Sequence, residues 1–146
     1  MSERSSGTGQ LPGRIYHLSP ASELRAGLDH SHYTPARFVV DGFVHATVEP
    51  QIVRAVAMDY FADCPEALLV LAIDTHRLDA EVRMEAPALL PGGRAHLTMT
   101  RSFPHIYGPV ARGAIVGVAE LPRGQTGFDW PARFSSLDEF LGQQAE

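Results

Sequence analysis

The alternation of apolar and polar positions divides the chain into short segments of helix and strand character. Residues 51–61 carry apolar side chains every three or four positions, which predicts a helix that begins at Thr47 or Glu49–Pro50 and ends before Pro65. The run "ALLVLAID", residues 67–74, is continuously apolar and predicts a central strand that is buried on both faces. Further strands are predicted over residues 14–18, 38–47, 80–86, 95–100 and 113–121.

Two further helices are predicted from their end signals. The segment "RIYHLSPASELRAGL" predicts a strand that feeds a helix, with Ser19 as the cap, Pro20 in the first position and Gly27 at the end. Near the C-terminus, Ser136 and Glu139 have the spacing of a capping box. About six short strands and three helices that do not alternate regularly indicate an α+β fold.

Composition predicts one domain with two appendages. The chain has 146 residues, a length typical of a single domain. Residues 1–13, "MSERSSGTGQLPG", are rich in Ser and Gly, so we expect a disordered tail. Residues 14–122 form the predicted α+β domain, and residues 123–146 form a C-terminal extension with a short helix.

Charge and cysteine content restrict the partners and the compartment. The net charge is -5, with acidic and basic residues interspersed and no basic stripe, so a nucleic-acid partner is not expected. No apolar run reaches the roughly 18 residues that cross a membrane, and the N-terminus lacks a signal-peptide core, so we expect a cytoplasmic protein without membrane contact. Cys64 is the single cysteine, which excludes an internal disulfide.

Three histidines stand in contexts that fix a side chain. His17 ends the first predicted strand, His45 lies in "DGFVHAT", and His105 lies in "RSFPHIYGPV". Histidine transfers protons near neutral pH and is also a common metal ligand. Each of them could instead be a packed strand residue bonded to a neighbour. The other four histidines lie in polar, turn-like or plainly alternating surroundings and are expected at the surface: His30, His32, His76 and His96.

The segment "RSFPHIYGPV" is unsuited to a plain strand. Pro104 and Pro109 each remove a backbone donor and reduce the freedom of the unfolded backbone. They would hold His105 in one direction, as a preorganised site requires. Tyr107 shares the segment and, taken alone, is explained as a core residue with a bonded hydroxyl. Glu85 ends an alternating strand and, taken alone, is explained as part of a solvated face.

The motifs "RIYHLS", "DGFVHAT", "LLVLAIDTHRL", "VRMEA" and "FPHIYGPV", in this order, resemble the bacterial domain of unknown function 952 family over residues 14–121. That family is similar in fold to ADP-ribosyltransferases and RNA 2′-phosphotransferases, which bind or cleave NAD in the cleft of a split β-sheet. The resemblance therefore implies an α+β fold with a split, mostly antiparallel sheet and short helices. The segment 87–101 is longer than the family pattern.

The resemblance also implies a site. His17 matches the histidine that bonds the nicotinamide-side ribose in the transferases, and His45, Glu85 and His105 match further motif positions as candidate catalytic residues. The transferases' late-strand glutamate has no clear equivalent, and Glu85 is the candidate to stabilise positive charge on the ribose. NAD or a related nucleotide is implied as the ligand and candidate substrate of a glycosyl or ADP-ribosyl transferase or hydrolase. The ligand-binding residues that this predicts are His17, Ser19, His45, Thr47, Arg101, His105, Tyr107 and Gly108.

Two other functions remain open at this stage. The same histidines and Glu85 could form a non-catalytic module that binds a metal or a small ligand, although no metal is expected. The pair His30 and His32 lies in a turn without a third ligand at useful spacing. The chain could also be a plain interaction domain.

Overall fold

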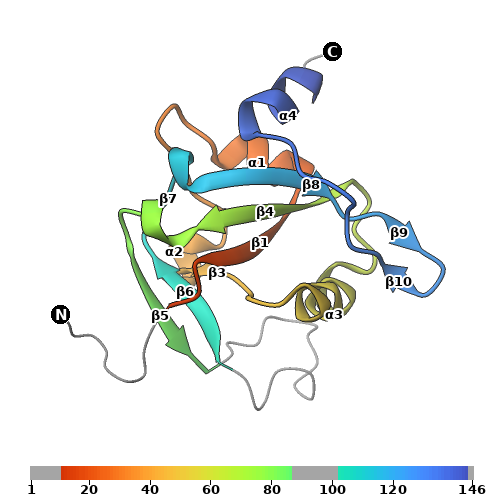
Figure 1. Cartoon of the computed structure of the whole chain (residues 1–146), viewed down its shortest axis with the longest axis horizontal. Helices are drawn as coiled ribbons and strands as arrows, with labels where there is room; N and C mark the ends of the chain where they lie inside the picture. The colour runs from red at the N-terminus through yellow and green to blue at the C-terminus, as the bar shows by residue number, and fades with distance from the viewer. Residues whose placement is uncertain (1–10, 87–101, 145–146) are drawn as a thin grey trace.

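A three-stranded antiparallel sheet forms the centre of the computed structural model, which describes residues 11–86 and 102–144 (Figure 1). The strands are β1 (Arg14–Pro20), β4 (Leu68–Asp74) and β8 (Ile115–Glu120), in the order β1-β4-β8. The predicted central strand is therefore confirmed: β4 is the middle strand and its first six residues are buried.

The two faces of β4 enter different parts of the core. Leu69 and Leu71 join one apolar cluster, whereas Leu68 and Val70 join a second cluster that includes Val53 of α3 (Pro50–Phe61). Successive side chains of a strand point to opposite faces, so an uninterrupted apolar run is what a strand covered on both sides requires.

A second antiparallel sheet lies beside the first in the order β3-β6-β5, from β3 (Val44–His45), β6 (Phe103–Tyr107) and β5 (Glu81–Glu85). An isolated bridge joins β1 to the segment that follows β3: the backbone N–H groups of Tyr16 and Thr47 each donate to the other's carbonyl at 2.8 Å. The protein is thus α+β with antiparallel strand pairings in its described residues.

Short elements complete the described structure. Two 3-10 turns lie at Thr75–Arg77 and Arg112–Ala114. The remaining elements are α1 (Ala21–Gly27), β2 (His32–Tyr33), α2 (Phe38–Asp41), β7 (Val110–Ala111), β9 (Arg123–Gly124), β10 (Gly127–Phe128) and α4 (Leu137–Gln144). Two-stranded sheets pair β2 with β7 and β9 with β10. In Figure 1, α4 lies above β8 at the top of the central sheet, and α3 lies below β1.

The strand predicted over residues 38–47 is wrong in its first half, where the chain forms helix α2. The apolar residues Val39 and Val40 are 86% and 71% exposed, so they do not mark a buried face. Gly42 ends the helix at a φ of +82°, a conformation that favours glycine. Only Val44 and His45 are in a strand.

The prediction that Ser19 caps the first helix is also wrong, because β1 continues through Pro20. Ser19 is fully buried, and its hydroxyl donates to the Pro20 carbonyl at 3.0 Å. Glu66 instead accepts bonds from the backbone N–H and the hydroxyl of Ser22, at 2.8 and 2.6 Å. A carboxylate from a distant segment therefore satisfies a first-turn donor that a helix would otherwise leave open.

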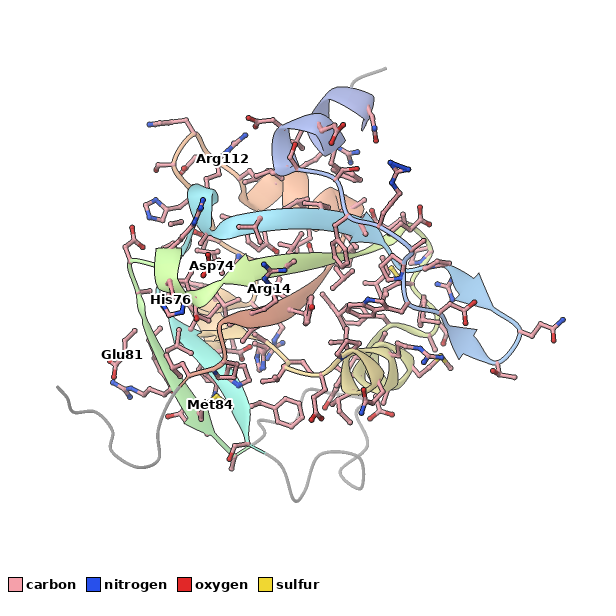
Figure 2. All side chains as sticks on the ribbon, viewed as in Figure 1. Arg14, Asp74, His76, Glu81, Met84 and Arg112 are labelled. Carbon is pink, nitrogen blue, oxygen red and sulfur yellow. The ribbon has the colours of Figure 1, made fainter. Side chains whose placement is uncertain are left out.

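The segment that looked unsuited to a plain strand forms β6, the middle strand of its sheet. Pro104 is the second residue of the strand, and its carbonyl still accepts a bond from the Ala46 N–H at 3.1 Å. Only the donor that proline lacks is lost from the ladder. His32, expected at the surface, lies in β2 and is half-buried beside Asp79, whereas His30 is exposed. His76 is also exposed (Figure 2).

The C-terminal residues contribute to the same core. Phe128 and Phe140 are buried in the two apolar clusters. The capping box of α4 is confirmed: the Glu139 N–H donates to Ser136 Oγ at 3.1 Å, and the Ser136 N–H donates to Glu139 Oε1 at 3.4 Å. The strand predicted over residues 95–100, the segment 87–101, His96 and the first ten residues of the predicted tail lie outside the described residues.

Candidate functional site

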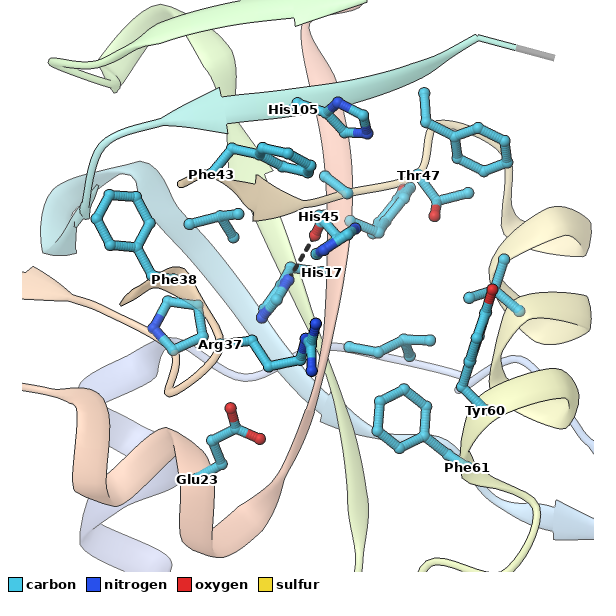
Figure 3. Close-up of a pocket in the computed structure, with 17 residues that line it drawn as sticks. His17, Glu23, Arg37, Phe38, Phe43, His45, Thr47, Tyr60, Phe61 and His105 are labelled. Atoms are coloured by element: carbon cyan, nitrogen blue, oxygen red, sulfur yellow. Dashed lines mark hydrogen bonds between the residues drawn. The ribbon is translucent and has the colours of Figure 1, made fainter. Parts of the chain in front are cut away.

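A cavity of about 380 Å³ opens where β1, the β3 segment and α3 meet (Figure 3). This volume lies within the range of small-molecule binding sites. The lining is mostly apolar and aromatic, with a few polar groups. Its residues are Tyr16, His17, Leu18, Glu23, Pro35, Arg37, Phe38, Phe43, Val44, His45, Ala46, Thr47, Val56, Tyr60, Phe61, Phe103 and His105.

His45 is held by a chain of charged partners spaced four residues apart. The His45 Nε2–H group donates to Asp41 Oδ2 at 2.7 Å. Arg37 donates to both oxygens of the same carboxylate, from Nε at 3.0 Å and from Nη2 at 2.8 Å. Arg37 precedes helix α2 and Asp41 ends it, so these two residues lie one helical turn apart. The turn at Gly42 then leads the chain to His45 in β3, on the other side of the Asp41 carboxylate.

The bond to Asp41 fixes the tautomer of His45. An ionised carboxylate only accepts hydrogen bonds, so the proton of the neutral ring lies on Nε2 and Nδ1 is left basic. Burial lowers the pKa of His45, and the Asp41 carboxylate acts in the opposite direction. The Arg37 guanidinium holds the pKa of Asp41 below its usual range. His45 is thus favoured as a neutral base that retains an oriented ring.

His105 forms a second carboxylate–histidine pair. The His105 Nδ1–H group donates to Glu85 Oε1 at 2.7 Å, and the Tyr107 hydroxyl donates to the same oxygen at 2.6 Å. These two bonds lower the pKa of Glu85, and the bond to Glu85 raises the pKa of Tyr107. The guanidinium carbon of Arg83 lies 4.4 Å from the centre of the Tyr107 ring. The His105 ring is therefore fixed, and in its neutral form the opposite nitrogen, Nε2, is a hydrogen-bond acceptor.

The two pairs face each other in the sheet. His45 and His105 are cross-strand partners in β3 and β6, and their ring centroids are 5.8 Å apart. Phe43 stacks on His105 with centroids 4.1 Å apart and lies 4.8 Å from the His45 ring. Both histidines line the cavity. The fold therefore places two oriented imidazoles, each with its own carboxylate, at one aromatic-walled site.

His17 is a buried neutral histidine on the same wall. Its Nδ1–H group donates to the His45 carbonyl at 2.6 Å, and Nε2 lies 3.3 Å from the Tyr33 hydroxyl. That hydroxyl also lies 3.2 Å from Ser19 Oγ, to which it donates. Burial lowers the pKa of His17 to about 4. At neutral pH the ring is therefore neutral, and Nε2 can accept a hydrogen bond.

The structure brings part of the predicted site together. His17, His45, Thr47 and His105 line the cavity. Glu85 holds His105 and is itself bonded by Tyr107, and neither Glu85 nor Tyr107 lines the cavity. Two further predicted residues do not line the cavity: Ser19 contacts Tyr33 beneath His17, and Gly108 lies against Ala80. Arg101 lies outside the described residues.

Sequence reasoning missed several residues of the site, above all Arg37 and Asp41. The spacing of four between Arg37 and Asp41 is a signal only in a helix, and a strand was predicted there. Asp41 meets His45 through the turn at Gly42, which the hydrophobic pattern did not predict. Glu23 of α1 lines the cavity, as do two aromatic residues of α3, Tyr60 and Phe61. No local pattern links these residues, because they come together only through the tertiary fold.

In residues 11–86 and 102–144, no three His, Cys, Asp or Glu side chains converge as a metal site would require. None of the helices there is both long enough and apolar enough to cross a membrane.

Comparisons with known proteins identify relatives in sequence and fold. The model of the family described as "Protein of unknown function (DUF952)" matches residues 18–118. The crystal structure of CC0527 from Caulobacter crescentus is similar, with a TM-score of 0.61 and 22% identity over 88% of this chain and 98% of that chain. The solution structure of CC0527 gives 0.56 and 23% identity over 80% and 91% of the two chains. No curated protein matches the sequence. At this identity the likeness shows the fold alone.

Proposed function

The chain belongs to the DUF952 family of proteins of unknown function. We propose that it binds NAD or a related nucleotide in the cavity, cleaves the glycosidic bond of this ligand, and passes the glycosyl or ADP-ribosyl group to water or to an acceptor. The observation that carries this proposal is the meeting of two carboxylate–histidine pairs, His45 with Asp41 and His105 with Glu85, at one aromatic-walled cavity. The resemblance of the motifs to the ADP-ribosyltransferase-like group supports the choice of ligand.

The cavity suits one half of a dinucleotide. Aromatic side chains offer flat surfaces for a heterocyclic ring, as small-molecule sites commonly do. The Thr47 hydroxyl and His17 Nε2 offer partners for sugar hydroxyls. About 380 Å³ holds a ring and its ribose, while the rest of the ligand extends through the mouth.

Cleavage of NAD by water needs a base but no acid. The bond from ribose C1′ to the ring nitrogen breaks, its electron pair neutralises the pyridinium, and nicotinamide leaves without taking a proton. Water forms the new C1′–O bond, and its proton passes to a base. His45 suits this step because its Nδ1 is basic and burial favours its neutral form. His105, oriented by Glu85, suits the binding of a ribose hydroxyl.

A ligand screen followed by product analysis tests the proposal. Ligand-observed NMR with NAD, ADP-ribose and AMP should detect binding of NAD. Incubation with NAD and chromatography should then detect nicotinamide and ADP-ribose, and His45→Ala should abolish their release. Binding without products would indicate a ligand-binding module without turnover. The proposal would be abandoned if none of the three nucleotides binds.

A further inference from the structure

The charged side chains around the cavity indicate whether it prefers a cationic or a neutral ring of a ligand. Resting on the proposed binding of NAD, we propose that the cavity selects a positively charged heteroaromatic ring over its neutral counterpart, and that Glu23 sets this preference. NAD+ should therefore bind more tightly than NADH, whose dihydronicotinamide ring is uncharged.

Glu23 and Arg37 are the acidic and basic side chains that line the cavity within the described part of the chain. They are not equivalent. Arg37 forms a two-bond ion pair with Asp41, at 3.0 and 2.8 Å, so its positive charge is largely offset. Glu23 Oε2 accepts a bond from the Ala36 backbone N–H at 3.1 Å. That uncharged donor orients the carboxylate and leaves its net charge in place.

Two of the histidines on the wall do not supply a compensating cation at neutral pH. Burial lowers the pKa of His17 to about 4, and burial also lowers the pKa of His45. The local charge therefore favours a cationic ligand group.

The apolar part of the wall favours the same kind of group. Tyr60 and Phe61 project from α3 on the opposite side of the cavity from Glu23 (Figure 3). The faces of aromatic rings attract organic cations, and the attraction grows when water is excluded. A flat cation between these rings and Glu23 would interact favourably with the aromatic faces and with the carboxylate. A neutral ring would not offset the negative charge of Glu23.

The test compares the affinities of NAD+ and NADH for the parent protein and for Glu23→Gln. Glutamine keeps an oxygen for the Ala36 N–H, so the fold should be preserved, and a melting curve checks this. In the parent, NAD+ should bind about five- to thirtyfold more tightly than NADH. In Glu23→Gln, the ratio should fall to within about twofold. Glu120→Gln, at an exposed position on β8, is the control and should keep the parent ratio.

A second ligand pair separates this inference from the proposed function. The cation 1-methylnicotinamide and neutral nicotinamide lack the phosphates and the adenosine. If neither NAD form binds, but the cation binds better than nicotinamide in a Glu23-dependent way, the proposed function fails and the inference stands. If NAD+ and NADH bind equally, or if Glu23→Gln leaves the ratio unchanged, the inference is wrong although NAD binding stands. If all four ligands fail to bind, both are wrong.

Discussion

His45 and His105 stand opposite each other on β3 and β6 with ring centroids 5.8 Å apart, and each donates a hydrogen bond to its own carboxylate at 2.7 Å. The two rings use different nitrogens, Nε2 toward Asp41 and Nδ1 toward Glu85. Each carboxylate fixes a tautomer, so the neutral rings expose the other nitrogen. The two imidazoles therefore present different free nitrogens at one site.

Glu85→Gln should release Tyr107 as well as His105. The bond to Glu85 Oε1 is the main cause of the raised pKa of Tyr107, so removal of the carboxylate charge should lower this pKa toward the ordinary value of about 10. Ultraviolet difference titration measures the change, and Tyr107→Phe identifies the transition. An unchanged tyrosine titration in Glu85→Gln would show that this bond does not control Tyr107.

His17 should make the protein less stable as the pH falls. Its pKa is about 4 when folded and about 6.5 when unfolded, so between these values the unfolded state binds more protons. Stability is therefore full above about pH 6.5 and decreases as the pH falls toward 4. At about 1.36 kcal/mol for each pH unit, the loss amounts to about 3 kcal/mol.

Urea unfolding of the parent and of His17→Asn between pH 7 and pH 5 measures this effect. The asparagine amide keeps a donor for the His45 carbonyl but does not titrate, so the variant should lose much of the pH dependence. His76→Asn, at an exposed position, should retain it. Equal pH dependence in the parent and in His17→Asn would contradict the buried neutral state of His17.

Tyr33→Phe should destabilise the fold by about 1–2 kcal/mol, because the fully buried hydroxyl donates to Ser19 Oγ and lies 3.3 Å from His17 Nε2. A double-mutant cycle with Ser19→Ala isolates the shared bond. Denaturant unfolding of the four proteins should show that the double variant loses less than the two single losses combined. Strict additivity would mean that this bond contributes nothing.

Gly27→Ala should destabilise the protein, because an added Cβ would overlap the Thr34 carbonyl oxygen. The backbone must shift to relieve this contact, at a cost of about 1–3 kcal/mol. Gly113→Ala is a matched control, since no heavy atom lies within 4 Å of its added Cβ. Thermal melting compares the two variants, and equal melting temperatures would contradict the close packing of α1 against the Thr34 segment.

The elements that the sequence predicted well are those whose burial follows a local pattern. The continuous apolar run of β4, the helical spacing of α3 and the Ser136–Glu139 box each appear in the structure as expected. A strand was predicted in place of helix α2 because Val39 and Val40 are apolar. Both side chains are exposed, so the apolar pattern in this segment does not mark a buried face. The ion pair between Arg37 and Asp41 and the turn at Gly42 decide the local structure instead.

The candidate site was predictable only in part, for a similar reason. The motif resemblance pointed to His17, His45 and His105, and all three line one cavity. It could not separate the residues on the wall from Glu85, which lies behind His105. Glu23 comes from another element and enters the site through tertiary packing, which no spacing in the sequence encodes.

The affinity of NAD for three histidine variants tests the central claim most directly. His17→Ala, His45→Ala and His105→Ala should each stay folded and weaken NAD binding by about two- to tenfold, the effect of one lost hydrogen bond to an uncharged group. The exposed controls His30→Ala and His76→Ala should bind as the parent does. If the three cavity variants instead melt far below the parent and bind NAD as the parent does, the histidines are structural and the account of the site is wrong.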